Sequence, residues 1–297
     1  MGVAVADDVR PARPLRRAVS RFLWKRPWVV LVVVLGVPLV WLAVVYLGSL
    51  ASLLLNAFYT TDPFTSDVVK HFSLTNFRDL LSDAIYRTVT IRTIGVALAV
   101  TVIDMAIGLP MAFYMAKVAR PRLRRALVVA VLMPLWASYL VKGYAWRSIL
   151  DPSSGVLTSS LGFSPGFGLT AAVVVLSYLW LPYMLLPIYA RLDRLPNSLL
   201  EASGDLGAKG GRTFLSVVLP LVKPSLIAGS IFTFSLSLGD FITIQIVGGK
   251  TQMIGNVVYA NFGAPNLPFA AAFALVPVVV MVGYLLVARR TGAFQDL

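Results

Sequence analysis

Cysteine is missing from this sequence of 297 residues, and histidine occurs once, as His71. These absences exclude disulfides, thiolate zinc sites, imidazole metal clusters and His-based catalytic dyads. Charge is also scarce, because only 13% of the residues are charged whereas 58% are hydrophobic, and the mean hydropathy is +0.81. A soluble domain carries about 25% charged residues. The composition therefore indicates an integral membrane protein with little of the polar chemistry that most enzymes need.

Six apolar segments are long enough to cross the hydrocarbon core as helices, which takes about 20 residues. They are residues 28–54, 93–116, 126–150, 169–190, 221–247 and 269–288. The fifth is interrupted by Pro224, Gly229, Gly239 and Asp240. Neighbouring helices in a bundle can provide hydrogen-bond partners for the backbone groups that such an interruption leaves free. The first follows basic residues as a signal peptide does, but it is longer than the ~7 to 15 apolar residues of a signal core. The sequence predicts an all-α integral membrane protein with about six transmembrane helices.

Basic residues predict which loops face the cytoplasm. Nineteen of the 26 Lys and Arg residues fall in the N-terminal segment, the second loop, the fourth loop and the C-terminal segment, and five fall in the other loops. Because basic residues are retained on the cytoplasmic side, we expect both termini to be cytoplasmic. Residues 1–27 are then a basic tail, 28–288 the transmembrane domain, and 289–297 a second tail. The net charge of +13 reflects this topology and attraction to the anionic lipid bilayer, and no nucleic-acid partner is expected.

The fourth loop contains an unusually polar segment, EASGDLGAKGGRTFLSVVLP (201–220). Ser198 and Glu201 have the spacing of a capping box, which predicts a helix start with Ser198 as the N-cap. An apolar stripe and a glycine stripe follow at helical spacing: Leu199, Ala202 and Leu206, and Gly204, Gly207 and Gly211. We expect a short amphipathic helix of about three turns. It lies either on the lipid headgroups as a linker or against another protein.

The same segment resembles the E-A-A-x3-G-x9-I-x-L-P signature of the membrane subunits of binding-protein-dependent ABC importers. The matching residues are Glu201, Ala202, Gly207, Leu219 and Pro220. Ser203 stands where the second alanine is usual, and Val217 stands where isoleucine is usual. The position also agrees, because the signature follows the fourth of six predicted spans.

Within that family the sequence is similar to the spermidine/putrescine permeases along most of its length. MPLWASYLVKGYAWRSILDPSSGVL (133–157) is similar to their P-x-W-x-S-x-L-V-R-x-Y-A-W segment, with Lys142 where arginine is common. VKPSLIAGSIFTFSLSLGDFITIQIVGG and IGNVVYANF continue the similarity. The resemblance favours spermidine or putrescine as the solute, and another organic cation, ferric iron or phosphonate is the alternative.

The resemblance implies that the chain forms half of a translocation pathway in a bacterial cytoplasmic membrane. The implied partners are a cytoplasmic ABC ATPase dimer, an extracytoplasmic solute-binding protein and a second, non-identical permease subunit. The chain itself is expected to hold no cofactor or metal, since ATP and Mg belong to the ATPase. GGKT (248–251) resembles the end of a P-loop, but Ile244 stands where a P-loop requires glycine. We therefore expect a non-catalytic subunit.

In that family the helix at about 198–211 is the coupling helix, which sits in a groove of the ATPase. The residues that the resemblance assigns to coupling are Glu201, Ala202, Ser203, Gly204, Asp205, Gly207, Leu219 and Pro220. Glu201 is expected to contact basic groups of the ATPase, and Gly207 to let the two backbones approach closely. The alternative for Glu201 is that it only caps its own helix.

Charged residues inside the spans are candidates for the substrate path, because each is costly in lipid. They are Asp104 in the second span, Lys142 in the third and Asp240 in the fifth. Asp240 could attract the ammonium groups of a polyamine, with aromatic faces nearby for cation–π contact. These aromatic candidates are Trp136, Tyr139, Tyr144, Trp146 and Phe241. Alternatively, Lys142 pairs with one of the aspartates and only stabilises the bundle, and the rings form an interfacial belt or pack helices.

Two other classes of protein fit the sequence less well. An ion-driven secondary transporter would carry inverted repeats with paired broken helices, and no convincing internal repeat is found. A membrane enzyme would need clustered acids, histidines or cysteines at one face, and the sequence offers none.

Overall fold

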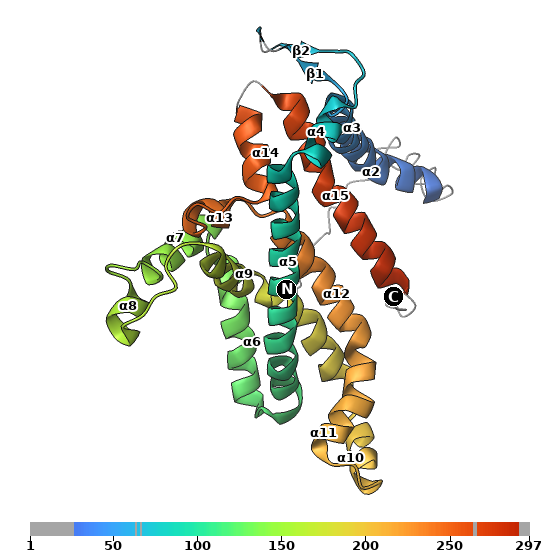
Figure 1. Ribbon diagram of the computed structural model, residues 1–297. Helices are drawn as coiled ribbons and strands as arrows, with labels where there is room; N and C mark the ends of the chain where they lie inside the picture. Colours follow the sequence, from blue (N-terminus) through green and yellow to red (C-terminus); the bar gives the residue numbers. More distant parts are fainter. Residues whose placement is uncertain (1–26, 63, 66, 264–265, 291–297) are drawn as a thin grey trace, which may run out of the picture. The chain divides into compact units, whose positions relative to one another are not determined.

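The computed structural model describes residues 27–62, 64–65, 67–263 and 266–290, and most of these are helical (Figure 1). The chain divides into two compact units, Met1–Leu55 and Asn56–Leu297. The first unit contains α2 (Pro27–Trp41), the π-helix η1 (Leu42–Leu47) and nearly all of α3 (Gly48–Asn56). The stretch Val34–Asn56 is long and apolar enough to cross a membrane, as predicted for the first span. The basic tail before Pro27 and the tail after Arg290 lie outside the described residues.

The second unit begins with a small polar subdomain. Strand β1 (Thr60–Thr61) pairs antiparallel with β2 (Val68–Val69), and helix α4 (Thr75–Ser82) follows. The Asp62 carboxylate accepts the backbone N–H groups of Phe64 and Thr65, which lowers the pKa of Asp62 below its usual value. This hairpin and α4 mark one end of the unit (Figure 1).

Three long helices form the core of the second unit. They are α5 (Ala84–Phe113), which continues into the π-helix η2 (Tyr114–Val118), α9 (Leu169–Arg194) and α12 (Leu219–Leu238), and each packs against the other two. The approach is close at two glycines. A Cβ atom on Gly229 would lie 2.9 Å from the Met184 carbonyl oxygen, and one on Gly108 would lie 3.4 Å from Met184 Cγ. Small residues thus allow α5 and α12 to pack directly against α9.

The third predicted span is bent rather than straight. Helix α6 (Pro121–Trp136) and helix α7 (Tyr139–Ile149) meet at an angle of 101°. Ala137 and Ser138 have extended backbone at the break. The physical reason lies in composition, because α7 carries Lys142 and Arg147, and such side chains are costly in the hydrocarbon core. The short helix α8 (Val156–Leu161) follows.

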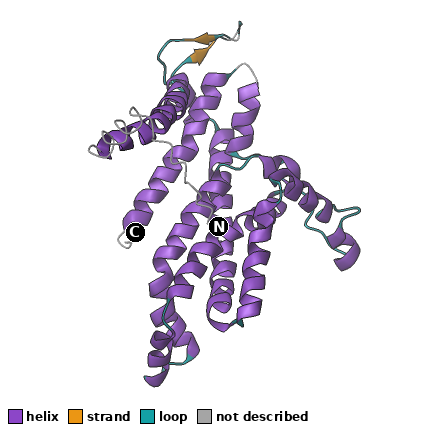
Figure 2. Cartoon of the chain, turned by 180° about the vertical axis from the view of Figure 1, so that it is seen from behind, coloured by secondary structure: helices purple, strands orange, loops and turns teal. Residues whose placement is uncertain are grey.

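The fifth predicted span also ends earlier than expected. Helix α12 stops at Leu238, and a separate short helix, α13 (Ile242–Val247), contains the remainder of the apolar run. Gly239 and Asp240 occupy the break. Helices α14 (Ile254–Gly263) and α15 (Leu267–Arg290) complete the unit and pack against each other (Figure 2).

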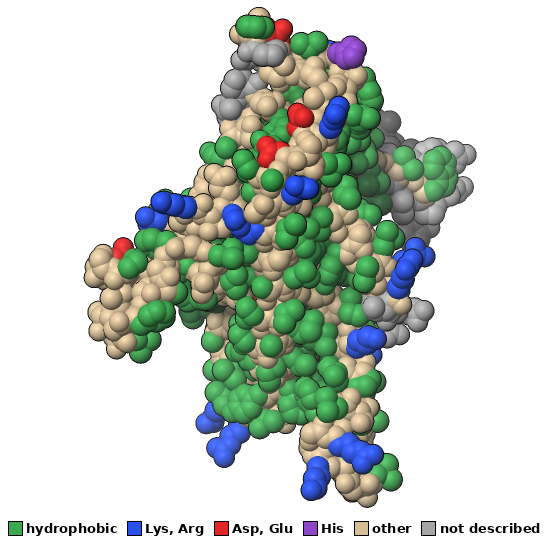
Figure 3. All heavy atoms as spheres, in the orientation of Figure 1, with side chains coloured by type: hydrophobic (Ala, Val, Ile, Leu, Met, Phe, Trp, Pro, Cys, Tyr) green, Lys and Arg blue, Asp and Glu red, His purple; other side chains and the backbone are tan. Residues whose placement is uncertain are grey.

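The described residues contain five helical segments able to cross a membrane, or six if α6 and α7 together count as one. This confirms an all-α membrane protein with five or six spans. Figure 3 shows how apolar and charged side chains are distributed over one face of the molecule. Apolar side chains cover the middle, Lys and Arg side chains gather at the end that carries α10 (Asn197–Asp205) and α11 (Gly210–Thr213), and Asp side chains lie towards the hairpin. We refer below to the α10 end and the hairpin end.

Candidate functional site

The polar segment folds into a short helix that leaves the end of α9. Helix α10 begins at Asn197, and Pro196 occupies the N-cap position, two residues before Ser198, the predicted N-cap. Its N-cap makes no side-chain hydrogen bond, so the predicted capping box of Ser198 and Glu201 is wrong. The reason is local, since proline fixes the backbone before the first turn and places Ser198 inside the helix. Glu201 therefore does not cap its own helix.

Gly207 ends this helix in a left-handed conformation. Its φ is +78°, its N–H donates to the Gly204 carbonyl at 2.8 Å, and the Ala208 N–H donates to the Ser203 carbonyl at 3.1 Å. These two bonds form a Schellman motif. Gly204, Gly207 and Gly211 do not form one helical stripe, because Gly204 lies in α10, Gly207 lies beyond its end and Gly211 lies in α11. Within this chain, the requirement for glycine at 207 is thus conformational.

Replacing Gly207 by alanine should therefore strain the turn, at a cost of about 1 to 2 kcal/mol for a left-handed non-glycine residue. No atom lies within 4 Å of a Cβ built there, so a clash makes no contribution. We expect Gly207→Ala to lower the thermal denaturation midpoint of the purified protein, and Gly207→Asn to lower it less. Gly210→Ala is the matched control, because Gly210 is also open to solvent but lacks positive φ. Equal midpoints for Gly207→Ala and the control would contradict this explanation.

The second half of the polar segment connects α10 to α12. Helix α11, the π-helix η3 (Phe214–Val218) and α12 follow one another without a break, and Leu219 and Pro220 form the first turn of α12. The Ser203 hydroxyl lies 3.0 Å from the Thr213 hydroxyl, which ties α10 to α11. The serine that departs from the family signature thus makes a specific contact. A movement of α10 would act directly on the base of α12.

The outer face of α10 is open. Glu201, Ala202, Gly204 and Asp205 are exposed, and Leu206 is 88% exposed. Glu201 is the only glutamate in the sequence, and its carboxylate forms no hydrogen bond or ion pair with the rest of the described chain. A carboxylate and a bare leucine presented together by a short helix are suited to docking on another protein.

A second polar group lies at the break between α12 and α13. Asp240 is buried and accepts hydrogen bonds from the Tyr139 hydroxyl, from the Thr243 N–H at 2.9 Å and from the Thr243 hydroxyl at 3.1 Å. The Tyr139 and Thr243 hydroxyls are 2.5 Å apart. Asp240 thus holds the start of α13 and fastens it to α7. At the other end of α13, the Arg147 guanidinium donates to the Ile246 carbonyl.

A cavity of about 230 Å³ opens beside Asp240. Its lining includes two of the predicted aromatic residues, Tyr139 and Phe241, and one that the sequence analysis missed, Trp180. The Trp180 ring stacks on Tyr139 with the centroids 5.9 Å apart. Trp180 falls within an apolar run that predicts only a span, so nothing in the sequence separated it from packing residues. The cavity combines one carboxylate with aromatic faces, which is a suitable environment for an organic cation.

The other predicted path residues lie outside this cavity. Trp136 is 88% exposed at the end of α6, and Tyr144 is also exposed. Trp146 packs edge-on against Tyr178 with the centroids 5.3 Å apart. Lys142 Nζ lies 6.0 Å from the Tyr139 ring centroid. Among the described residues Lys142 pairs with neither aspartate, so the alternative of a bundle-stabilising ion pair is not supported.

Asp104 lies in α5, within the core formed with α9 and α12, and is fully buried. The Ser177 hydroxyl of α9 lies near the Asp104 carboxylate, and the buried hydroxyls of Thr233 and Ser237 on α12 have no hydrogen-bond partner among the described residues. The structure therefore does not bring Asp104 together with Asp240. Its assignment to the substrate path stays a prediction.

Residues 104–293 match the model of the family described as binding-protein-dependent transport system inner membrane component. The chain belongs to this family. As one of its permeases, the chain is a multi-pass inner membrane subunit of an ABC importer, which functions with a substrate-binding protein. Permeases of this family are non-catalytic, and a separate subunit hydrolyses ATP.

Curated relatives of this permease cover nearly all of its length. It is 44% identical over 306 residues to the inner membrane ABC transporter permease protein YdcU of Escherichia coli strain K12, covering 97% of each chain. It is 30% identical over 278 residues to the spermidine/putrescine transport system permease protein PotB of Salmonella typhimurium, covering 89% of this chain and 93% of PotB. PotB of Escherichia coli strain K12 is 31% identical over 249 residues, with 80% and 88% covered.

Solved structures share the fold of this permease at low sequence identity. A bacterial ABC transporter involved in the import of the acidic polysaccharide alginate matches with a TM-score of 0.62 and 17% identity, covering 92% of this chain and 99% of that one. The inward-facing MetNI methionine ABC transporter matches with a TM-score of 0.55 and 19% identity, covering 69% and 93%. The arrangement of α5, α9 and α12 is therefore that of an ABC importer permease.

Proposed function

We propose that this permease forms half of a translocation pathway for a polyamine, spermidine or putrescine. The observation that carries the proposal is the similarity to PotB proteins, spermidine/putrescine permeases by name, over 89% of the chain. The cavity beside Asp240 supports it, because a carboxylate flanked by Tyr139, Trp180 and Phe241 offers both charge and ring faces to an ammonium group. Asp240 is the residue expected to attract the cationic substrate.

We further propose that residues 201–220 couple the permease to its ATPase. Helix α10 with the turn that follows it presents Glu201 and Leu206 on an open face, and beyond residues 206–209 the elements α11, η3 and α12 follow one another without a break. The ATPase dimer would receive this face in a groove, with basic groups opposite Glu201. ATP and Mg would be bound by that dimer and not by this chain.

The remaining parts of the assembly follow from the same proposal. The α10 end, where Lys and Arg side chains gather in Figure 3, would face the cytoplasm, because basic loops are retained there. Both termini would then be cytoplasmic. A second, non-identical permease would complete the pathway, and the solute-binding protein would deliver the polyamine from the opposite side.

The test is transport by the complete importer reconstituted in liposomes with ATP inside. We expect ATP-dependent accumulation of labelled spermidine when the permease, its partner permease, the ATPase and the binding protein are all present. Omitting the ATPase should abolish accumulation. Unlabelled putrescine, other organic cations, ferric iron and phosphonate are the competitors that define the solute.

Two results would overturn the proposal in different ways. Accumulation driven by an ion gradient in vesicles that contain only this chain would contradict ATP-driven import. ATP-dependent accumulation of labelled ferric iron or phosphonate without accumulation of labelled spermidine or putrescine would keep the importer and reject the polyamine. Binding of spermidine by the isolated binding protein provides a measurement that does not depend on transport.

A further inference from the structure

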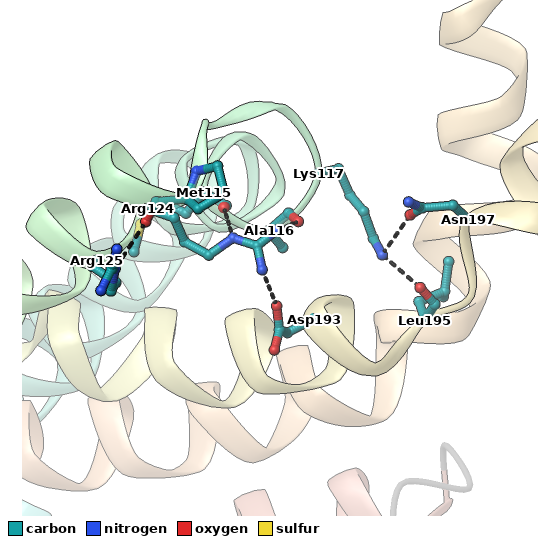
Figure 4. Close-up of polar contacts among 9 residues, drawn as sticks. Met115, Ala116, Lys117, Arg124, Arg125, Asp193, Leu195 and Asn197 are labelled. Atoms are coloured by element: carbon teal, nitrogen blue, oxygen red, sulfur yellow. Dashed lines mark hydrogen bonds and ion pairs between the residues drawn. The ribbon is translucent and has the colours of Figure 1, made fainter.

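Two basic side chains at the α10 end join helices that are far apart in the sequence (Figure 4). The first is Lys117, near the end of η2. Its ammonium group donates to the Leu195 carbonyl at 2.5 Å and to Asn197 Oδ1 at 3.2 Å. Leu195 follows the last residue of α9, and Asn197 is the first residue of α10. Lys117 therefore connects the base of α5 and η2 to the start of α10.

The second basic residue is Arg124, in the second turn of α6. Its guanidinium donates to the Met115 carbonyl at 3.1 Å, to the Ala116 carbonyl at 2.7 Å and to Asp193 Oδ1 at 2.9 Å. In Figure 4 the guanidinium lies between the end of η2 and the last turn of α9. Arg124 thus joins three elements: η2, α6 and α9.

The two contacts have a common physical basis. The last carbonyls of a helix have no partner within the helix and carry partial negative charge, so a cation placed there is stabilising. Lys117 comes from η2 and serves the end of α9, while Arg124 comes from α6 and serves the end of η2. The Arg124–Asp193 pair alone would contribute little, since the two side chains are 37% and 43% exposed. The planar guanidinium of Arg124 donates to three acceptors at once, and because its donors point in fixed directions it holds these acceptors in one arrangement.

Among the described residues, the neighbouring Arg125, unlike Arg124, forms a hydrogen bond only with its own helix. Its guanidinium donates at 3.3 Å to the Pro121 carbonyl, which belongs to its own helix, and Arg125 is exposed. The basic cluster of this loop therefore contains residues of two kinds. Lys117 and Arg124 fix helices relative to one another, and Arg125 joins no second helix.

We propose that Lys117, Arg124 and Asp193 are positioning residues that hold α10 at a fixed orientation to η2 and α6. This inference rests on the proposed role of α10 in coupling. Helix α10 leads along the chain into α11, η3 and α12, whereas among the described residues the side-chain hydrogen bond that joins it to η2 is the one from Lys117 to Asn197. With the clasp formed by these three residues intact, a movement imposed on α10 reaches α5 as well as α12. Without it, α10 moves α12 alone.

The sequence permits a direct measurement, because it contains no cysteine. Spin labels at Arg122→Cys in α6 and Ser198→Cys in α10, both exposed positions, report the distance between the two helices. The sample is the assembled importer in nanodiscs, without nucleotide and with ATP and vanadate. We expect one narrow distance distribution in both states for the otherwise unaltered protein and for Arg125→Met. Arg124→Met and Lys117→Met should broaden it.

Coupling provides the second measurement. In liposomes supplied with labelled spermidine, Arg124→Met should raise the ratio of ATP hydrolysed to solute imported by about fivefold, the lower range of typical coupling energies. Lys117→Met should raise this ratio as well. Lys117→Arg should stay close to the original ratio, because it keeps a cation at the Leu195 carbonyl. Arg125→Met, which removes the same charge from the next position, should keep the original ratio.

The outcomes separate this inference from the proposed function. Unchanged distance distributions in Arg124→Met and Lys117→Met would overturn the clasp, even if polyamine transport is confirmed. Equal broadening by Arg124→Met and Arg125→Met would overturn it as well, since net charge would then be the cause. If spermidine is not the solute, the distance measurement still tests the clasp, because it requires no transported solute. If Arg124→Met fails to assemble, Arg124→Lys keeps a cation but cannot serve three acceptors, and a distribution as narrow as that of the unaltered protein would reject the inference.

Discussion

Glu201→Lys is expected to detach the ATPase from the permease while the permease itself stays folded. The expectation follows from two facts about Glu201: it is exposed on α10, and its carboxylate forms no hydrogen bond or ion pair with the rest of the described chain. Reversing its charge removes nothing within the subunit, but it places like charges opposite each other at the proposed interface, which costs several kcal/mol. The affinity of the purified ATPase for immobilised permease should fall about a hundredfold or more.

Two comparisons make the Glu201 result interpretable. Glu201→Gln keeps the shape and loses only the charge, so its loss of ATPase binding should be intermediate. The thermal midpoint of the isolated permease should be the same for all three proteins. A lowered midpoint would show that Glu201 supports the fold, and undiminished ATPase retention by Glu201→Lys would place the interface elsewhere.

The sequence predicts most of the fold because apolar length decides it. The starts and ends of α9 and α15 agree with the predicted spans to within a few residues. The bend after Trp136 was not predicted, and for the fifth span the interruption at Gly239 and Asp240 was predicted but the end of the helix at Leu238 was not. In each case a few polar residues, Ser138 with Lys142 in one and Gly239 with Asp240 in the other, turn the chain before the run ends. Hydropathy averaged over a window cannot register such a turn.

The candidate site was predicted in part, for a similar reason. Spacing located α10 and the 201–220 segment, but the capping box failed because the N-cap is Pro196, two residues before Ser198. The basic residues of the second loop predicted only topology. Their sequence positions gave no indication that Lys117 and Arg124 serve the ends of other helices, because the acceptors are backbone carbonyls, which every residue possesses. Such contacts depend on tertiary structure alone.

Asp240→Asn is expected to reduce polyamine uptake strongly without disturbing the fold. The asparagine oxygen can still accept the Thr243 N–H, and its amide can donate to the Tyr139 and Thr243 hydroxyls, which are able to accept. The local network is therefore preserved and only the negative charge is lost. We expect the KM of the reconstituted importer to rise about tenfold for spermidine. The rise should be smaller for putrescine, which carries fewer ammonium groups.

Thr243→Val tests the structural role of Asp240 separately. It removes the hydroxyl contact to Asp240 but keeps the carboxylate and the Thr243 backbone N–H bond. If Asp240 serves the substrate, Thr243→Val should lower the thermal midpoint and leave the KM for spermidine near its original value. If Asp240 only fastens α13 to α7, Asp240→Asn should transport with the original KM, and Thr243→Val should be the more damaging change. Asp240→Asn is thus the more damaging variant for uptake if Asp240 serves the substrate, and Thr243→Val is the more damaging one if Asp240 only fastens α13. Uptake curves of the two variants therefore decide whether this carboxylate faces the substrate.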